Sequence, residues 1–255
     1  MGRPAVNGDP DDGFTPGFLG RDESYDGFPA SSFARDESYD GFPASFFARD
    51  DPSPDTDFYR STRLVTHIDD RAIAAVGELY AELGIDGSAK TPRRVLDLMS
   101  SWVSHFRTPP AELVVLGMNA VELDANDAAS ERVVRDLNTD PTLPFATASF
   151  DAVTCCVSVD YLVRPIEVLR DVSRVLRPDG VVAITFSNRC FPTKAIRGWL
   201  ATDDEQHCSI VTTYLQRAGG FTDPVAQLRT PRSPYQDPLY AVVARRARDN
   251  EFSTG

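Results

Sequence analysis

The sequence predicts an α/β protein built on a doubly wound, mostly parallel sheet of seven strands. After Pro92, short runs rich in apolar and β-branched residues alternate with stretches of helical spacing, which is typical of parallel strands joined by crossover helices. The run 181–186 is almost wholly apolar, as expected of a strand covered on both faces. The strands are expected at 94–98, 112–117, 133–137, 150–157, 181–187, 225–228 and 239–244.

A helix is predicted before the first strand, because apolar residues between 68 and 83 recur at helical spacing. Asp69 or Asp70 can cap its start, and Gly84 is suited to its end. Between the fourth and fifth strands, residues 165–176 also place apolar side chains on one face. A proline and a glycine close behind this second helix are expected to end it.

The first quarter of the chain differs from the rest. Residues 21–34 recur almost unchanged at 35–48, a tandem duplication of 14 residues, and residues 1–60 hold 13 acidic residues against 5 arginines. Such a segment buries too little apolar surface to offset its ordering entropy. We therefore expect a disordered acidic tail, although its regularly spaced aromatic residues leave open a role in recognition. The expected divisions are 1–56 for the tail, 57–90 for a helical lid segment, 91–247 for the main domain and 248–255 for a second tail.

The composition limits the partners. The formal net charge is −12, from 28 Asp and 10 Glu against 24 Arg and 2 Lys, and such a surface repels the phosphates of nucleic acids. Growth in concentrated salt and a GC-rich genome would both explain the scarcity of lysine. No apolar run approaches 18 residues and no basic-then-apolar leader is present, so a cytoplasmic protein without a membrane span is expected. The four cysteines form no C-x-x-C pair, so no metal site is expected.

Motifs at the fourth and fifth strands carry a family resemblance. Ser149-Phe-Asp-Ala-Val153 is followed by Arg174-Val-Leu-Arg-Pro-Asp-Gly-Val-Val-Ala-Ile184, and Asp136-Leu137 by Leu143-Pro-Phe145. Over residues 91–246 the chain resembles the class I S-adenosylmethionine-dependent methyltransferases, in particular the type 11 branch. The resemblance implies a Rossmann-like sheet, S-adenosylmethionine as the cofactor and methyl transfer, most simply to a small-molecule acceptor.

The resemblance also implies cofactor contacts at the ends of the strands. Asp97 stands where the family keeps an acidic residue that can hold the cofactor's ammonium group, near the switch point of the sheet. Asp136 matches the acidic residue that receives the adenine amino group, and the Leu137 amide can complete the adenine edge. Cys156, at the end of the fourth strand, is expected among the cofactor contacts. For both aspartates, a helix cap or a turn is an alternative role.

The chain departs from the family in the loop after the first strand. Where the family has Gly-x-Gly-x-Gly, this sequence has Met99, Ser101 and Val103, and Cβ atoms hinder close approach of the main chain to a ligand. The hydroxyls of Ser100 and Ser101 can replace bare amides as donors to the cofactor's carboxylate. Trp102, in the same loop, can cover the cofactor or face the substrate.

A second departure follows the second strand, where Gly117-Met-Asn119 replaces Gly-x-Asp. An aspartate accepts two ribose hydroxyl protons, whereas Asn119 offers one acceptor and one donor group. Glu122 can take over the ribose, or it can be an exposed acid in the first turn of a helix.

Candidates for the chemistry are few, because methyl transfer needs alignment, exclusion of water and at most one proton acceptor. His105 is the expected base, since it lies at the carboxyl end of the first strand, although it can also be a merely structural loop histidine. His207 is expected on the surface. Lys194, like Arg189, can bind an anionic acceptor or can simply solvate its loop. The expected substrate contacts are Tyr59, Arg63, Asn188 and Arg189.

Two rival functions remain open. A binding or regulatory protein can retain this fold without transferring a methyl group. A nicotinamide-dependent oxidoreductase is disfavoured, because no G-x-G-x-x-G follows the first strand.

Overall fold

The computed structural model describes residues 37–231, 233 and 235–248. Residues 37–44 belong to a separate unit, in which Glu37–Tyr39 form one turn of 3-10 helix (η1). All elements discussed below belong to the unit that begins at Ser45.

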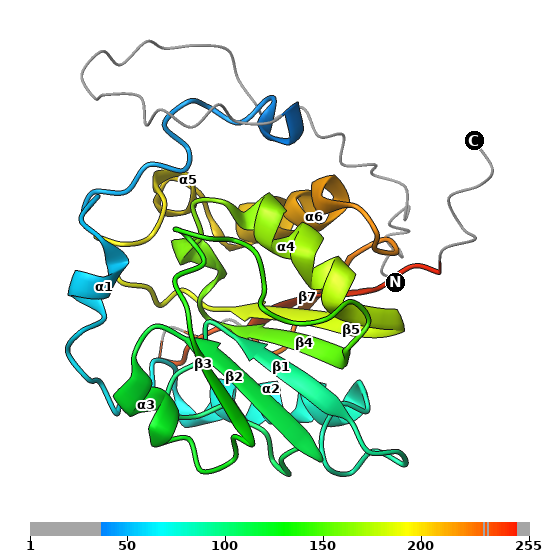
Figure 1. The fold of residues 1–255 in the computed structure, drawn as a ribbon. Coiled ribbons are helices and arrows are strands. Elements are labelled where there is room, and N and C mark those ends of the chain that lie inside the picture. Colours follow the sequence, from blue (N-terminus) through cyan, green and yellow to red (C-terminus); the bar gives the residue numbers. More distant parts are fainter. Residues whose placement is uncertain (1–36, 232, 234, 249–255) are drawn as a thin grey trace, which may run out of the picture. The chain divides into compact units, whose positions relative to one another are not determined.

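The predicted doubly wound sheet is confirmed. Seven strands lie in the order β3-β2-β1-β4-β5-β7-β6 (Figure 1). Strands β1 to β5 pair in parallel, whereas β7 is antiparallel to both β5 and β6. The strands are β1 (Arg94–Leu98), β2 (Glu112–Gly117), β3 (Glu131–Val134), β4 (Phe150–Cys156), β5 (Leu176–Phe186), β6 (Val225–Leu228) and β7 (Tyr240–Arg245).

Helices cover the two faces of the sheet (Figure 1). Residues of α2 (Asp70–Glu82) pack with Val95 of β1 and Val115 of β2. The opposite face carries α4 (Pro165–Val175) and α6 (Asp204–Ala218), which contact each other. The shorter helices are α1 (Asp55–Phe58), α3 (Ala120–Asp124), α5 (Arg197–Leu200) and the 3-10 turn η2 (Val159–Tyr161).

Local capping explains the bounds of α2. The Asp69 side chain accepts a hydrogen bond from the Ala72 amide at 2.8 Å, which satisfies one of the free amides of the first turn. Gly84, just beyond the helix, has a φ of +64°, a conformation that glycine adopts without strain. Both features agree with the sequence.

The third and fifth strands differ from their expected bounds. β3 begins and ends earlier than expected, because Glu131–Val134 pair with β2 whereas Asp136 already belongs to a turn. β5 begins directly after α4, at Leu176, with a register shift opposite Phe150–Ala152. The expected proline and glycine therefore lie in a bulge within β5, where a Cβ on Gly180 would crowd the Arg177 carbonyl.

The connection between β1 and β2 contains no helix. Residues 99–111 cross from one strand to the next as an irregular loop, although crossovers between parallel strands usually include one. The loop packs on α2: the ring of Phe106 lies 4.6 Å from that of Tyr80, and a Cβ on Gly77 would collide with the Arg107 side chain. α2, which precedes β1, thus supports the loop after β1.

Residues 45–56, the strap, pack on the domain where the sequence predicted the tail to continue. Phe46 and Phe47 are buried, and the amides of Arg197 and Gly198 donate to strap carbonyls, each at 2.8 Å. Lys194 has no exposed surface and pairs with Asp51 at 3.1 Å and with Asp55 at 3.4 Å. The described chain is therefore ordered from earlier than Asp57, because two buried rings and a buried ammonium group hold the strap.

His207 is not on the surface as expected. It is 6% exposed, and its ring stacks on Trp199 with centroids 3.8 Å apart. Its Nε2 lies 2.9 Å from the Trp199 carbonyl oxygen. The helical periodicity of α6 turns this histidine towards α5, which the sequence did not predict to be a helix.

Candidate active site

A cavity of about 280 Å³ lies at the carboxyl ends of the central strands, where ligands collect in open α/β sheets. Its walls come from the ends of β1, β2 and β4, the loops after β3 and β5, and residues 57–67. Residues 57–67 are the part of the predicted 57–90 segment that precedes α2, and the name lid segment is used below for this part alone. Every predicted cofactor residue lines it: Asp97, Ser100, Ser101, Trp102, Asn119, Asp136, Leu137 and Cys156.

Asp97 provides a buried carboxyl group at the floor of the site. It is 2% exposed, and its two oxygens accept hydrogen bonds from Ser100 Oγ at 2.6 Å and Thr154 Oγ1 at 2.8 Å. Burial raises the pKa of Asp97, and these hydrogen bonds oppose that rise. The carboxyl group is thus held in one orientation and is suited to bind a cation.

The loop after β1 has a strained backbone beside Asp97. Met99 and His105 have φ values of 55° and 53°, and Val157 at the end of β4 has 46°, all in the left-handed region that favours glycine. The loop also folds tightly over β2, since the Ser100 amide donates to the Leu116 carbonyl at 2.8 Å and a Cβ on Gly117 would collide with the Ser100 carbonyl. Such strain persists only where the surrounding packing enforces it.

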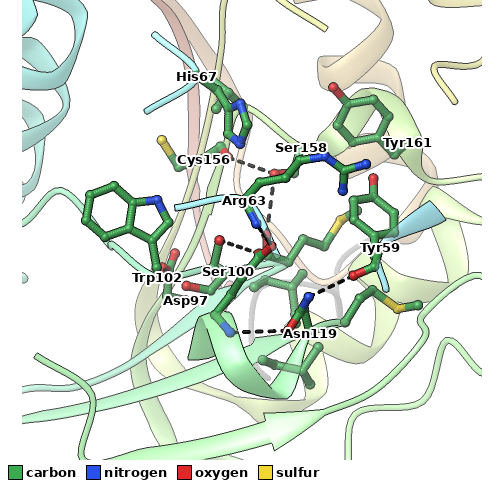
Figure 2. A pocket seen from close by; sticks show the side chains of 18 of the residues that line it. Tyr59, Arg63, His67, Asp97, Ser100, Trp102, Asn119, Cys156, Ser158 and Tyr161 are labelled. Carbon is green, nitrogen blue, oxygen red and sulfur yellow. Dashed lines mark hydrogen bonds between the residues drawn. The ribbon is translucent and has the colours of Figure 1, made fainter. Parts of the chain in front are cut away.

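The lid segment is hydrogen-bonded to Trp102 and Asn119, two of the predicted cofactor residues, and to Glu122; Figure 2 shows the bond between Asn119 and Tyr59. The Asn119 amide group donates to the Tyr59 carbonyl at 2.9 Å, and Trp102 Nε1 donates to the Val65 carbonyl at 3.0 Å. Glu122 accepts from the Arg63 amide at 2.7 Å. These bonds close the lid over the loop and over the end of β2.

Asn119 and Glu122 therefore have definite structural partners. The Asn119 side-chain oxygen caps α3 by accepting from the amides of Val121 and Glu122 at 3.0 and 3.2 Å. Glu122 is 8% exposed, and its second oxygen accepts from Ser101 Oγ at 2.7 Å. The alternative of an exposed acid in the first turn is wrong for Glu122, because α3 directs it into the cavity wall.

Asp136 forms a turn. Its oxygens accept from the Asn138 amide at 2.9 Å and from the Thr139 hydroxyl at 2.8 Å, which is the common behaviour of aspartate at the start of a turn. Asp136 also lines the cavity beside the buried Leu137. The turn thus fixes the carboxylate at the cavity wall without excluding a ligand contact.

The two histidines of the cavity are His67 and His105. Burial lowers the pKa of both, and for His105 the neighbouring His67 adds to this effect. Both imidazoles are therefore neutral at neutral pH and can accept a proton. Burial raises the pKa of the Cys156 thiol to about 12, so this thiol does not act as a nucleophile.

The predicted substrate residues are only partly brought together. Tyr59, Arg63 and Arg189 line the cavity; Arg189 is paired with Asp237 at 2.7 Å. Asn188 is exposed and is not part of the cavity wall. Lys194 does not face an acceptor either, because it is buried against the strap.

Asn138 connects the walls of the cavity and was not predicted from the sequence. Asn138 donates to Asp55 at 2.8 Å and to the Tyr161 carbonyl at 2.9 Å, and it accepts from the Val163 amide at 2.8 Å. It thereby joins the loop after β3 to the strap and to the loop after β4. No local sequence pattern marks such a role, because its partners are between 23 and 83 residues away.

Asp160 follows the fourth strand, at the edge where ligands are expected, but its burial was not predicted from the sequence. It is 2% exposed, its Oδ2 has no hydrogen-bond partner among the described residues, and burial raises its pKa to about 8. Asp160 in turn raises the pKa of Tyr59, Tyr161 and Cys190, although burial is the larger cause for each. These groups are therefore uncharged at neutral pH, and Tyr59, Tyr161 and Cys190 line the cavity.

Neither a metal site nor a membrane helix is present in the described part of the chain. His, Cys, Asp and Glu side chains there do not gather in the groups of three that a metal ion would need. Over the same residues, no helix combines the length and apolar character required to cross a bilayer.

Residues 104–184 match a family model described as a methyltransferase domain. No curated protein matches the chain. Among solved structures, the trans-methyltransferase CalH complexed with SAH is 16% identical with a TM-score of 0.51, and the alignment covers 69% of this chain and 58% of that one. An S-adenosylmethionine dependent methyltransferase from Mesorhizobium loti is 15% identical (TM-score 0.47; 68% and 98% covered), and the [4+2]-cyclase SpnF is 14% identical (TM-score 0.47; 67% and 81% covered). This chain thus spans little more than half the length of CalH.

Proposed function

We propose that the chain is a class I S-adenosylmethionine-dependent methyltransferase that methylates a small-molecule acceptor, with His105 as the proton acceptor; the methyltransferase-domain model that matches residues 104–184 supports this family. The observation that carries the proposal is the cavity at the strand ends, whose wall includes the buried Asp97, the neutral His105 and the lid segment. A cavity of about 280 Å³ is close to the lower end of the roughly 300–1,000 Å³ typical of small-molecule pockets.

The chemistry of the cavity wall fits the cofactor. Asp97 is proposed to hold its ammonium group, oriented by Ser100 and Thr154. Glu122 is proposed to take the ribose in place of Asn119, whose side-chain oxygen is used to cap α3. A carboxylate has about four acceptor sites, so the two bonds that Glu122 already accepts leave capacity for a ligand. Asp136, Leu137, Ser101, Trp102 and Cys156 are proposed as the remaining cofactor contacts.

When bound, S-adenosylmethionine supplies an electrophilic methyl group on a sulfonium centre. The chain's own residues have three tasks: to align the acceptor, exclude water and remove a proton. The lid segment excludes water through its bonds to Trp102, Asn119 and Glu122. His105 accepts the proton of the acceptor, since its imidazole is uncharged at neutral pH. Tyr59 and Arg189, which also line the cavity, contact the acceptor in this proposal.

A second candidate function is a cofactor-binding protein without transfer activity. The observation that favours it is the commitment of Asn119 and Glu122 to the lid backbone and of the loop after β1 to packing on Gly117. In this case the lid would close over the cofactor without admitting an acceptor.

Transfer of label from methyl-labelled S-adenosylmethionine separates the two functions. We expect the wild-type protein to label a compound in a low-molecular-weight cell extract. His105→Ala should lower that rate by roughly 10²- to 10⁴-fold while calorimetric binding of S-adenosylhomocysteine is retained. His67→Ala is the matched control, because His67 lines the same cavity from the exposed lid segment, and it should lower the rate much less.

Two outcomes would contradict the proposal. If S-adenosylhomocysteine binds but no extract is labelled, the second candidate is correct. If neither S-adenosylhomocysteine nor S-adenosylmethionine binds at low or at high salt, the cofactor site is absent. Because burial lowers the pKa of His105, the rate should fall only below the ordinary histidine pKa as the pH decreases.

A further inference from the structure

One cation of the cavity stands apart from the others. Arg135 pairs with Asp140 and Arg189 with Asp237, whereas no carboxylate among the described residues pairs with the Arg63 guanidinium. Among the described residues, the guanidinium donates only to carbonyl oxygens, those of Phe58 at 3.1 Å and Ser61 at 3.2 Å. In an acidic chain with abundant carboxylates, an arginine in a cavity without a counter-ion calls for an explanation.

Aromatic rings hold the Arg63 guanidinium in place. Its central carbon lies 4.6 Å from the centroid of Phe58 and 5.6 Å from that of Phe191. Phe191 packs in turn against Phe58 at 5.3 Å and Tyr161 at 6.0 Å. Stacking already orients the planar guanidinium, so the side chain loses little further mobility when it binds a ligand. Figure 2 shows the head group directed to the same part of the cavity as Tyr59 and Tyr161.

Arg63 spans the two halves of the site. Its backbone amide binds Glu122 on the β2 side, while its guanidinium lies against Phe191, which follows β5. The proposed cofactor anchors lie at the ends of β1, β2 and β3, and β4 separates those strands from β5 in the sheet. The guanidinium is therefore on the acceptor side, within an aromatic wall.

We infer that Arg63 binds a carboxylate of the methyl acceptor, and hence that the acceptor is a small organic acid with an apolar or aromatic body. The inference rests on the proposed function for the identity of the site. The planar fork of arginine matches a carboxylate with two parallel hydrogen bonds, and the rings of Tyr161 and Phe191 suit an apolar body. A singly charged carboxylate is favoured over a phosphate dianion, because carboxylates of Asp55, Glu122 and Asp136 also line the cavity.

The test uses small carboxylates and their uncharged amides as probes. Benzoate, phenylacetate, cinnamate and hexanoate are each compared with the corresponding amide by calorimetry, at saturating S-adenosylhomocysteine. At least one carboxylate should bind the wild-type protein at least tenfold more tightly than its amide. Arg63→Gln should abolish that preference, and Arg63→Lys, which keeps the charge but loses the fork, should retain part of it.

Arg60→Gln is the matched control. Arg60 lies three residues earlier on the lid segment, is exposed and pairs with Asp57, so the change removes the same charge outside the cavity. It should leave the preference for the carboxylate unchanged. Thermal unfolding of the three variants establishes that each is folded.

Three results would overturn the inference. The first is that no carboxylate of the panel binds better than its amide. The second is that Arg60→Gln weakens binding as much as Arg63→Gln. The third is that Arg63→Gln weakens the binding of S-adenosylhomocysteine at least tenfold but does not change the binding of 5′-methylthioadenosine or of benzoate. This result would assign Arg63 to the carboxylate of the cofactor. Failure of S-adenosylhomocysteine to bind the wild-type protein would instead refute the proposed function.

Discussion

The sheet and the segment over its edge are held by different forces. The central strands are buried and their apolar side chains pack on both faces, with Leu96 of β1 fully enclosed. The strap and lid segment, residues 45–67, depend on only two buried rings, Phe46 and Phe47, and otherwise on ion pairs and single hydrogen bonds, such as Lys194 to Asp55 and Trp102 to Val65. Apolar packing depends little on pH and on charge screening by salt, whereas charge pairs depend on both. The scaffold and the cover of the site should therefore respond to different conditions.

The largest effect is expected in the sheet. Leu96→Ala should lower the free energy of unfolding by about 2–5 kcal/mol, because it removes fully buried methyl groups and leaves a cavity. Denaturant unfolding measures this loss. Val134→Ala, on the edge strand β3 and 58% exposed, is the control and should change stability by less than about 0.5 kcal/mol. Equal losses in the two variants would show that the central strands are not the main source of stability.

The next effect is expected in the strap alone. Lys194→Met keeps the length of the side chain but leaves Asp55 with Arg49 as its one remaining cationic partner, and should destabilise the docked strap by about 2 kcal/mol. Hydrogen exchange at the amides of Arg197 and Gly198, which bond to strap carbonyls, should become roughly 30-fold faster. Lys90→Met, at the other lysine, which is exposed, should have no effect. An equal increase in the exchange rate of the amides in β4 would show that the strap and the sheet do not open separately.

The third effect depends on pH and concerns Asp160, which is buried in the 3-10 turn η2. The folded-state pKa of Asp160 is raised from 3.8 to about 8, so its stabilising contribution is complete below about pH 4 and is lost as the pH rises towards 8. Stability of the wild-type protein relative to Asp160→Asn should fall by up to about 1.4 kcal/mol for each pH unit in this window. Asp127→Asn, at an exposed site on the surface, should show no such slope.

The same contrast explains what the sequence could predict. The bounds of β1, β2, β6 and α2 follow from apolar periodicity and caps, which are local signals. The packing of the strap could not be predicted, because its composition resembles a disordered tail and its two buried rings contact residues far along the chain. Phe46 packs on Gly198 and Phe47 on Tyr214.

The candidate site divides in the same way. Asp97 and Asp136 could be placed because each ends a predictable strand or begins a turn. The partners of Asn119 and Arg63 could not be predicted, because the Tyr59 carbonyl and the Glu122 carboxylate lie 60 and 59 residues away along the chain. The burial of Asp160 and the hydrogen bonds of Asn138 carry no local sequence signal, because both depend on residues that are distant in the sequence. Motifs thus identify anchors at strand ends, and only the three-dimensional structure reveals which of them the lid already uses.

The two copies of the 14-residue repeat differ at the position of Phe46. The Phe46 ring fills the space that a side chain on Gly198 would need, whereas the first copy has Ser32 at the equivalent position. Deletion of residues 21–34 would keep the contact between Phe46 and Gly198. Deletion of residues 35–48 would place a serine at the position of Phe46, and the space beside Gly198 would no longer be filled by a ring. The two copies are therefore not equivalent, because only the second carries the phenylalanine that packs on Gly198.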